Sequence, residues 1–184
     1  MKNFKSILRI WLPFAVVISA FCALAYATVQ QAYRQGADDP QIQMAEDAAY
    51  ELDKGTSVEN VVPAQDVDIS RSLAPFYVIF NKEQEPIASS GLLNGEMPRL
   101  PDGVLDYALE NHGNSLTWEP QPGTRIAAVI IPYKEGFVLA GRNMREVEMR
   151  EAQTTAFAGT TWILGMIATL IVIAFGEFFL KDKT

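Results

Sequence analysis

Five side chains in the centre of the chain have the chemistry to hold a small ligand. Arg125 begins a predicted strand among apolar residues, and Arg142 ends the last predicted strand. A guanidinium beside a pocket suits a carboxylate, because it donates two parallel hydrogen bonds to the two oxygens. Tyr77, Trp118 and Tyr133 could form the aromatic walls of such a pocket. The alternative is that the arginines form surface ion pairs and that the aromatic residues belong to an ordinary core.

The central region, residues 30–155, contains few of the side chains that catalytic and metal sites need. It contains one histidine, His112, and no cysteine, which excludes a zinc site of the usual kind. A Gly-x-Ser-x-Gly nucleophile pattern is also absent. His112 is predicted in the last turn of a helix, where the helix dipole favours a cation, and pH sensing is the alternative. We therefore expect neither an enzyme nor a metal or other cofactor.

A set of short strands must position these residues. Dense β-favouring runs and polar turns predict strands at residues 76–80, 86–91, 115–119, 125–133 and 136–141. The first two form a hairpin around the polar turn 81–85. Residues 126–131 are apolar on both faces, which predicts a strand that is covered on both sides.

Three helices are predicted around these strands. Asp39-Pro40 is typical of a helix start, and apolar residues then recur at helical spacing as far as Gly55. Asp102 is predicted to cap a second helix, which ends at Gly113. From Arg142 a third helix is predicted to run without interruption into the apolar block near the end of the chain. The predicted order is therefore helix, two strands, helix, three strands and exit helix, and a mostly antiparallel sheet with helices packed at its side is an α+β fold.

Two uncharged, mostly apolar blocks lie at opposite ends of the 184-residue chain, at residues 10–33 and 152–176. Because about 20 apolar residues cross a bilayer, a purely soluble protein is excluded. The predicted organisation is a cytoplasmic N-terminus (1–9), a transmembrane helix (10–29), an extracytoplasmic domain (30–155), a second transmembrane helix (156–180) and a cytoplasmic tail (181–184).

Charge predicts the topology of these two spans. Lys2, Lys5 and Arg9 precede the first block, and Lys181 and Lys183 follow the second. Lysine and arginine gather on the cytoplasmic side, so both termini are predicted to be cytoplasmic. The central region has 20 acidic and 10 basic residues, which argues against nucleic acid as a partner.

A cleaved signal peptide is the alternative interpretation of the first block. Ala23-Leu24-Ala25 and Ala25-Tyr26-Ala27 both have the small-x-small pattern of a cleavage site, but the apolar stretch 10–27 is longer than the usual signal core. Cys22 is the only cysteine, and the bulky Phe21 before it argues against lipoprotein processing. Without a second cysteine the domain must fold by core packing alone.

Both blocks carry small residues at a spacing of four. They are Ala15, Ser19, Ala23 and Ala27 in the first block and Thr161, Gly165 and Thr169 in the second. Small side chains on one face allow two helix backbones to approach closely. We therefore expect these stripes to pack helix on helix, either within one chain or between the protomers of a homodimer.

The order of elements between two spans resembles the single-Cache and PAS-like extracytoplasmic sensor domains of bacterial receptors. The resemblance covers about residues 40–155, and is carried by the hairpin Phe76–Ser90 and by the closing segment Gly136–Arg142. It implies a mostly antiparallel sheet that holds a small ligand or a partner, with an exit helix that transmits a shift. Only residues 181–184 follow the second span, so we expect the output to come from a separate membrane partner, a kinase or a transporter.

Two functions remain open at this point. The first is a membrane-anchored extracytoplasmic sensing module that binds a small carboxylate-type ligand. The second is a structural or accessory membrane protein whose exported domain binds another protein and no small ligand.

The predicted topology can be tested with reporter fusions. A reporter fused after Thr184 should be active only in the cytoplasm, and one inserted near Asn94, in a predicted loop, should report export. Cytoplasmic activity of the Asn94 insertion would contradict the two-span topology. A mature protein that begins near Gln30 would instead establish signal cleavage and a single span.

Overall fold

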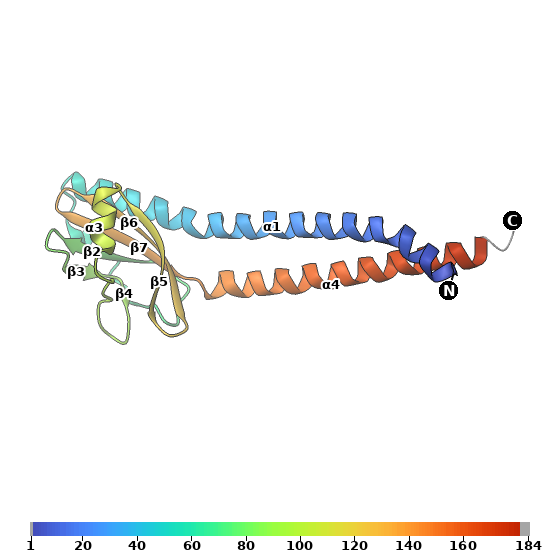
Figure 1. The fold of residues 1–184 in the computed structure, drawn as a ribbon. Coiled ribbons are helices and arrows are strands. Elements are labelled where there is room, and N and C mark those ends of the chain that lie inside the picture. Colours follow the sequence, from blue (N-terminus) through green and yellow to red (C-terminus); the bar gives the residue numbers. More distant parts are fainter. Residues whose placement is uncertain (1, 181–184) are drawn as a thin grey trace. The chain divides into compact units, whose positions relative to one another are not determined.

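The computed structural model describes residues 2–180, and in residues 2, 3, 34, 35, 37, 38, 179 and 180 it describes the backbone alone. Lys181 and Lys183, on which part of the topology prediction depends, lie outside the described residues. The chain divides into two compact units (Figure 1). A helical unit contains residues 1–33 and 149–184, and a sheet domain contains residues 34–148.

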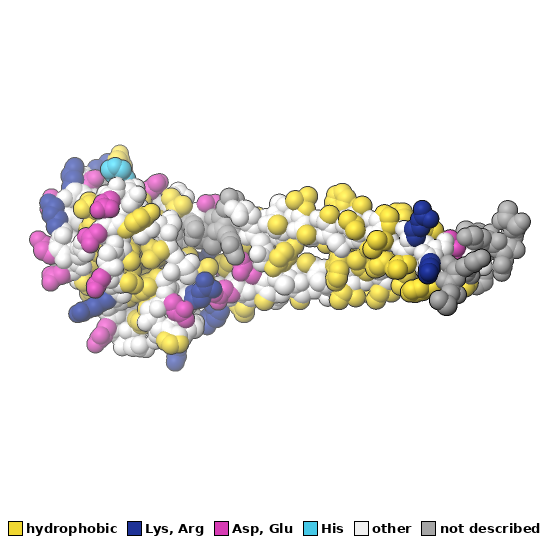
Figure 2. Space-filling view, viewed as in Figure 1, with side chains coloured by type: hydrophobic (Ala, Val, Ile, Leu, Met, Phe, Trp, Pro, Cys, Tyr) yellow, Lys and Arg dark blue, Asp and Glu magenta, His cyan; other side chains and the backbone are white. Residues whose placement is uncertain are grey.

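The helical unit is built from the ends of the two long helices. Helix α1 covers Lys2–Asp53, and α4 covers Arg145–Phe175 and continues as the π-helical turn η1, Gly176–Leu180. Two stretches, Phe4–Tyr33 and Arg145–Phe178, are long and apolar enough to cross a membrane. In Figure 2 the hydrophobic side chains gather along this unit, whereas the charged side chains gather over the sheet domain.

Helix α1 does not begin at Asp39-Pro40 as predicted, because residues 2–53 form one helix. An aspartate followed by proline is favoured at a helix start, but proline is also found inside a helix when its surroundings hold the helix together. Pro40 has no N–H for the carbonyl of Gly36, so one backbone hydrogen bond is missing at this point. The predicted end is confirmed, since Gly55 follows Asp53 with a positive φ of 94°.

The sheet domain is organised around five antiparallel strands in the order β3-β2-β7-β6-β5 (Figure 1). Their bounds are β2 Phe76–Asn81, β3 Pro86–Ser89, β5 Asn114–Gln121, β6 Thr124–Tyr133 and β7 Gly136–Asn143. The predicted hairpin and the three later strands are therefore confirmed, as is the α+β class. Strand β7 is longer than predicted, and Arg142 lies in it rather than in the exit helix.

Helix α1 covers one face of the sheet. Ala45, Ala48 and Ala49 are buried against Ile79 and Val138, and Val129 and Ala140 belong to the same cluster. These small side chains let the helix backbone lie close to the strands. Gln41 continues this stripe and is fully buried, and neither of its amide atoms has a hydrogen-bond partner among the described residues. An unpaired buried amide costs a fold about 1–3 kcal/mol.

Larger side chains fill the opposite face. Phe76, Phe80, Trp118, Ile130 and Leu139 form its core. The cover comes from helix α3, Val104–Glu110, and from a two-stranded parallel pair, β1 Val67–Asp68 with β4 Gly91–Leu92. Strand β6 is thus apolar and covered on both faces, as its sequence predicts.

The loops differ from the sequence predictions in two details. Gly103, not Asp102, is the residue before α3, and no side chain caps that helix. His112 lies beyond the end of α3, in a left-handed conformation with a φ of 57°, and is exposed. Between Gly55 and β2 the chain is mostly irregular, and its regular elements are β1 and the four-residue helix α2, Val58–Val61.

The packing of Phe76 over Gly141 generates a stability prediction. A Cβ at Gly141 would lie 2.6 Å from Cζ of Phe76, whose ring is buried. Overpacking of this kind costs about 1–3 kcal/mol. We expect Gly141→Ala to lower the thermal midpoint of the full chain in detergent, measured by circular dichroism.

Adding Phe76→Leu to Gly141→Ala should recover part of that loss, because the smaller side chain makes room. Gly36→Ala is the control, since a Cβ there has no neighbour within 4 Å and alanine favours a helix. An unchanged midpoint in Gly141→Ala would show that the ring is not held over this glycine.

Candidate functional site

The five predicted ligand residues are distributed over both faces of the sheet. Tyr77 on β2 and Tyr133 on β6 lie on the face that α1 covers, and both are half-buried. Burial raises the pKa of both tyrosines, with smaller contributions from Asp47 at Tyr77, and from Glu135 and then Asp53 at Tyr133. Tyr77 is paired with Ala140 and Tyr133 with Gly136. The two tyrosines therefore lie at different positions along strand β7.

The two arginines have protein partners at the end of the sheet. Nη2 of Arg142 lies 2.9 Å from Oε2 of Glu146, and its Nε donates to the carbonyl oxygen of Leu73 at 3.2 Å. Nη1 of Arg125 lies 2.7 Å from Oε1 of Glu148. The alternative of ion pairs is therefore what the structure shows for both guanidiniums.

Trp118 is separated from the other four predicted residues. It lies on the face of the sheet opposite α1, and only 5% of its surface is exposed. The structure thus does not bring the five residues into one pocket.

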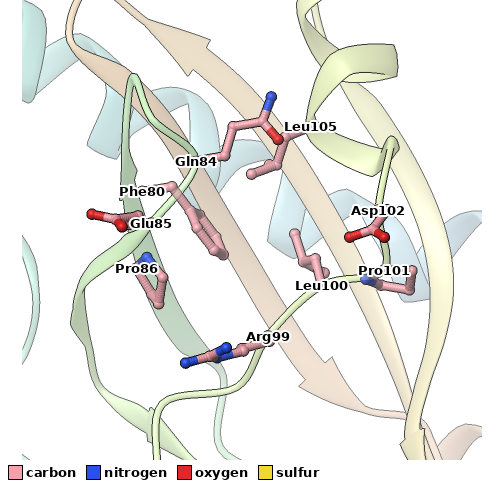
Figure 3. A pocket seen from close by; sticks show the side chains of 9 residues that line it. All are labelled: Phe80, Gln84, Glu85, Pro86, Arg99, Leu100, Pro101, Asp102 and Leu105. Carbon is pink, nitrogen blue, oxygen red and sulfur yellow. The ribbon is translucent and has the colours of Figure 1, made fainter.

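A pocket that the sequence did not predict lies on the same face as Trp118. It has a volume of about 540 Å³, within the range of small-molecule sites. Its floor is formed by Phe80, Leu100 and Leu105, which converge between the β2–β3 hairpin and α3 (Figure 3). Phe80 and Leu105 are also members of the hydrophobic core on this face, so the floor of the pocket is continuous with the core.

Polar side chains surround this apolar floor. Arg99 reaches from the loop toward Pro86, Asp102 stands on the other side of the floor, and Glu85 points away from it (Figure 3). The Gln84 side chain donates to Oδ1 of Asp106. Among the described residues, no carboxylate lies within ion-pair distance of Arg99, in contrast to Arg125 and Arg142. Of Arg99, Arg125 and Arg142, Arg99 is thus the one without a carboxylate partner among the described residues.

A second hollow of about 520 Å³ shares the loop residues Arg99, Leu100 and Pro101 with the pocket. Trp118 lines it, so one of the predicted aromatic residues does border a cavity. The loop 93–101 thus contributes to both hollows.

Arg99 is not among the predicted ligand residues, because it follows Asn94 in a segment that is predicted to be a loop, between the strand 86–91 and the helix that begins after Asp102. One signal was present: Arg99 is the only basic residue of that stretch, and Pro98 and Pro101 flank it closely. Prolines restrict the backbone and so hold a side chain in place at a low cost in entropy. In the described part of the chain, no group of three or more His, Cys, Asp or Glu side chains is placed to hold a metal ion.

The helical unit has its own set of predicted residues. Its two helices form an antiparallel pair, joined by hydrogen bonds from Trp11 Nε1 to the Met166 carbonyl (3.2 Å) and from Trp162 Nε1 to Ser19 Oγ (2.9 Å). A third bond joins the hydroxyls of Tyr26 and Thr155 at 3.0 Å. Interhelical hydrogen bonds of this kind help to hold helices together in a bilayer.

The predicted stripes of small residues coincide only in part with the seam, the line along which the two helices contact each other. Ala15 is buried, and Ser19, Gly165 and Thr169 are half-buried, whereas Ala23, Ala27 and Thr161 are exposed in the pair. A spacing of four residues advances about 40° around a helix of 3.6 residues per turn, so such a stripe leaves the seam after two steps. Packing of Ala23 and Ala27 between protomers stays a prediction.

The comparisons with known proteins do not assign the chain to a family. No family model, no curated protein and no solved structure matches it.

The raised pKa values of Tyr77 and Tyr133 predict a loss of stability in alkaline solution. Each tyrosine ionises less readily in the folded chain than in the unfolded chain, whose tyrosines have a pKa of about 10. Their contribution to the free energy of unfolding is therefore complete below about pH 10, and it is lost as the pH rises through the pKa of the folded state. The midpoint of thermal unfolding in detergent should therefore fall as the pH rises above about 10, and Tyr77→Phe with Tyr133→Phe should reduce that fall.

Tyr107→Phe is the control, because Tyr107 lies on α3 with 54% of its surface exposed. An equal alkaline loss in the double variant and the wild type would contradict the assignment to these two hydroxyls.

Proposed function

We propose that the sheet domain is an extracytoplasmic ligand-binding module that is anchored in the membrane by the two apolar helices. In this proposal the pocket beside Arg99 binds a small molecule that carries a carboxylate. The role is binding rather than catalysis, and the bound state is read by a separate membrane protein, a kinase or a transporter.

The availability of Arg99 beside an apolar floor is the observation that carries this proposal. A guanidinium without a protein partner can form two parallel hydrogen bonds to a ligand carboxylate. Phe80, Leu100 and Leu105 offer apolar contact for the remainder of the ligand. In this proposal Arg99 binds the carboxylate. Arg125 and Arg142, which were predicted to do so, form ion pairs with Glu148 and Glu146 instead.

Membrane anchoring is supported by the surface of the helical unit. Its large apolar side chains are exposed along both helices, including Phe21 at 69%, Leu24 at 64%, Phe157 at 73% and Val172 at 70%. Exposed apolar surface of this extent is unfavourable in water and favourable in a bilayer. The basic residues at the chain ends support an orientation with both termini in the cytoplasm.

The proposal assigns the domain to the single-Cache and PAS-like class. It is supported by the antiparallel sheet, by the helices at its side and by the uninterrupted helix α4 that leaves strand β7. A ligand that binds two arrangements of the domain with different affinity shifts their populations, and α4 is the element that would carry the difference.

The ligand class can be tested by thermal melting of the full chain in nanodiscs against a panel of small carboxylates. A ligand that binds only the folded chain raises the free energy of unfolding by mass action, by about 2.7 kcal/mol at a hundred times its Kd, and the thermal midpoint rises with it. Arg99→Gln should abolish the shift and leave the midpoint without ligand unchanged, because this side chain is exposed.

Arg125→Gln is the matched control, since it removes a guanidinium that already has a carboxylate partner, and it should retain the shift. A ligand whose shift survives Arg99→Gln would show that it binds elsewhere. No shift with any member of a broad panel would favour the other function, an accessory domain that binds a protein.

A further inference from the structure

The segment Ile69–Leu73, which we call the bridge, is held by three side chains around the start of α4, those of Arg142, Asn143 and Arg145. Nδ2 of Asn143 donates to the carbonyl of Ile69 at 2.9 Å, and Nη2 of Arg145 donates to that of Arg71 at 2.7 Å. Nε of Arg142 donates to the carbonyl of Leu73 at 3.2 Å. Every second carbonyl of the bridge is thus bound by the junction between β7 and α4.

Asn143 connects the bridge to the helix itself. Its amide nitrogen binds Ile69, and its side-chain oxygen accepts the backbone N–H of Arg145 at 2.9 Å. The side chain is 5% exposed, so water offers little competition for these bonds. One amide group therefore fixes the first turn of α4 and the bridge at the same time.

Ile69, the first residue of the bridge, is also bonded to strand β4, which leads into the pocket loop. The backbone N–H of Ile69 donates to the Leu92 carbonyl at 3.0 Å, and that of Val67 donates to the Ser90 carbonyl at 2.7 Å. Leu92 is followed directly by the loop 93–101, which contains Arg99 and lines both hollows. Ile69 is itself buried in the core on this face of the sheet.

We infer that the bridge couples the pocket loop to the exit helix. The connection starts at α4 with two hydrogen bonds to the bridge, from the Arg145 guanidinium to Arg71 and from Asn143 to Ile69, and it continues from Ile69 to Leu92. The β1–β4 pair that it includes has only two residues in each strand, so its register is weakly held and can respond to the loop. The functional use of this coupling rests on the proposed ligand binding, but its existence does not.

The coupling can be measured without any ligand, by hydrogen exchange and mass spectrometry on the full chain in nanodiscs. Arg145→Ala removes the bond to Arg71 at an exposed position. Asn143→Asp keeps an oxygen for the N–H of Arg145 but loses the donor to Ile69. In both variants the amides of residues 93–101 should exchange about three- to ten-fold faster, as expected for the loss of one hydrogen bond.

Arg125→Gln is the matched control, because it breaks the ion pair with Glu148 in the same first turn of α4 without touching the bridge. It should leave the exchange of residues 93–101 unchanged. Two results would overturn the inference. One is that Arg145→Ala accelerates exchange in the bridge but not in residues 93–101, and the other is that Arg125→Gln accelerates exchange in residues 93–101 as well. Should Asn143→Asp fail to fold, Arg145→Ala decides the outcome alone. Failure of ligand binding at Arg99 would not alter either result.

Discussion

The sheet is apolar on both faces, and a sheet of this kind is stable only when each face is shielded from water. Helix α1 shields one face with alanines, among them Ala45 and Ala48, which bring a long helix close to the strands. The other face carries large rings, including Phe76 and Phe80, and its cover is assembled from short elements. One long helix packs continuously against its face of the sheet, whereas a cover made of several short elements leaves hollows between them. The pocket therefore lies opposite α1.

Strand β7 occupies the centre of the sheet and leads into α4, so the residues at this transition connect the core to the exit helix. Arg142, whose position at the end of a strand predicts a ligand contact, holds the bridge and pairs with Glu146 instead. Arg99, on an irregular loop, is left available. Arg125 and Arg142, which lie in strands, are thus held by carboxylates, whereas Arg99 on the loop has no such partner among the described residues.

The regular elements could be predicted because local patterns determine them. The run Phe76–Phe80 with its polar turn indicates a hairpin, and the apolar residues of 126–131 indicate a strand buried on both faces. The start of α1 could not be predicted, because Asp39-Pro40 is compatible with both a helix start and a helix interior. The pocket depends on the path of residues 93–101, which is set by contacts with distant strands. Which face Tyr77 and Tyr133 occupy likewise depends on where α1 packs, which the spacing within a strand does not reveal.

We expect α1 to remain packed on the sheet, whereas the cover on the opposite face opens locally around the loop 93–101. Residue-resolved hydrogen exchange of the wild-type chain in nanodiscs tests it directly, since local opening and global unfolding have different free energies. The account predicts that amides of residues 45–52 exchange as slowly as those of strand β6, and that amides of residues 93–102 exchange by a local opening of much lower free energy. Exchange of residues 45–52 as fast as that of the loop would contradict it.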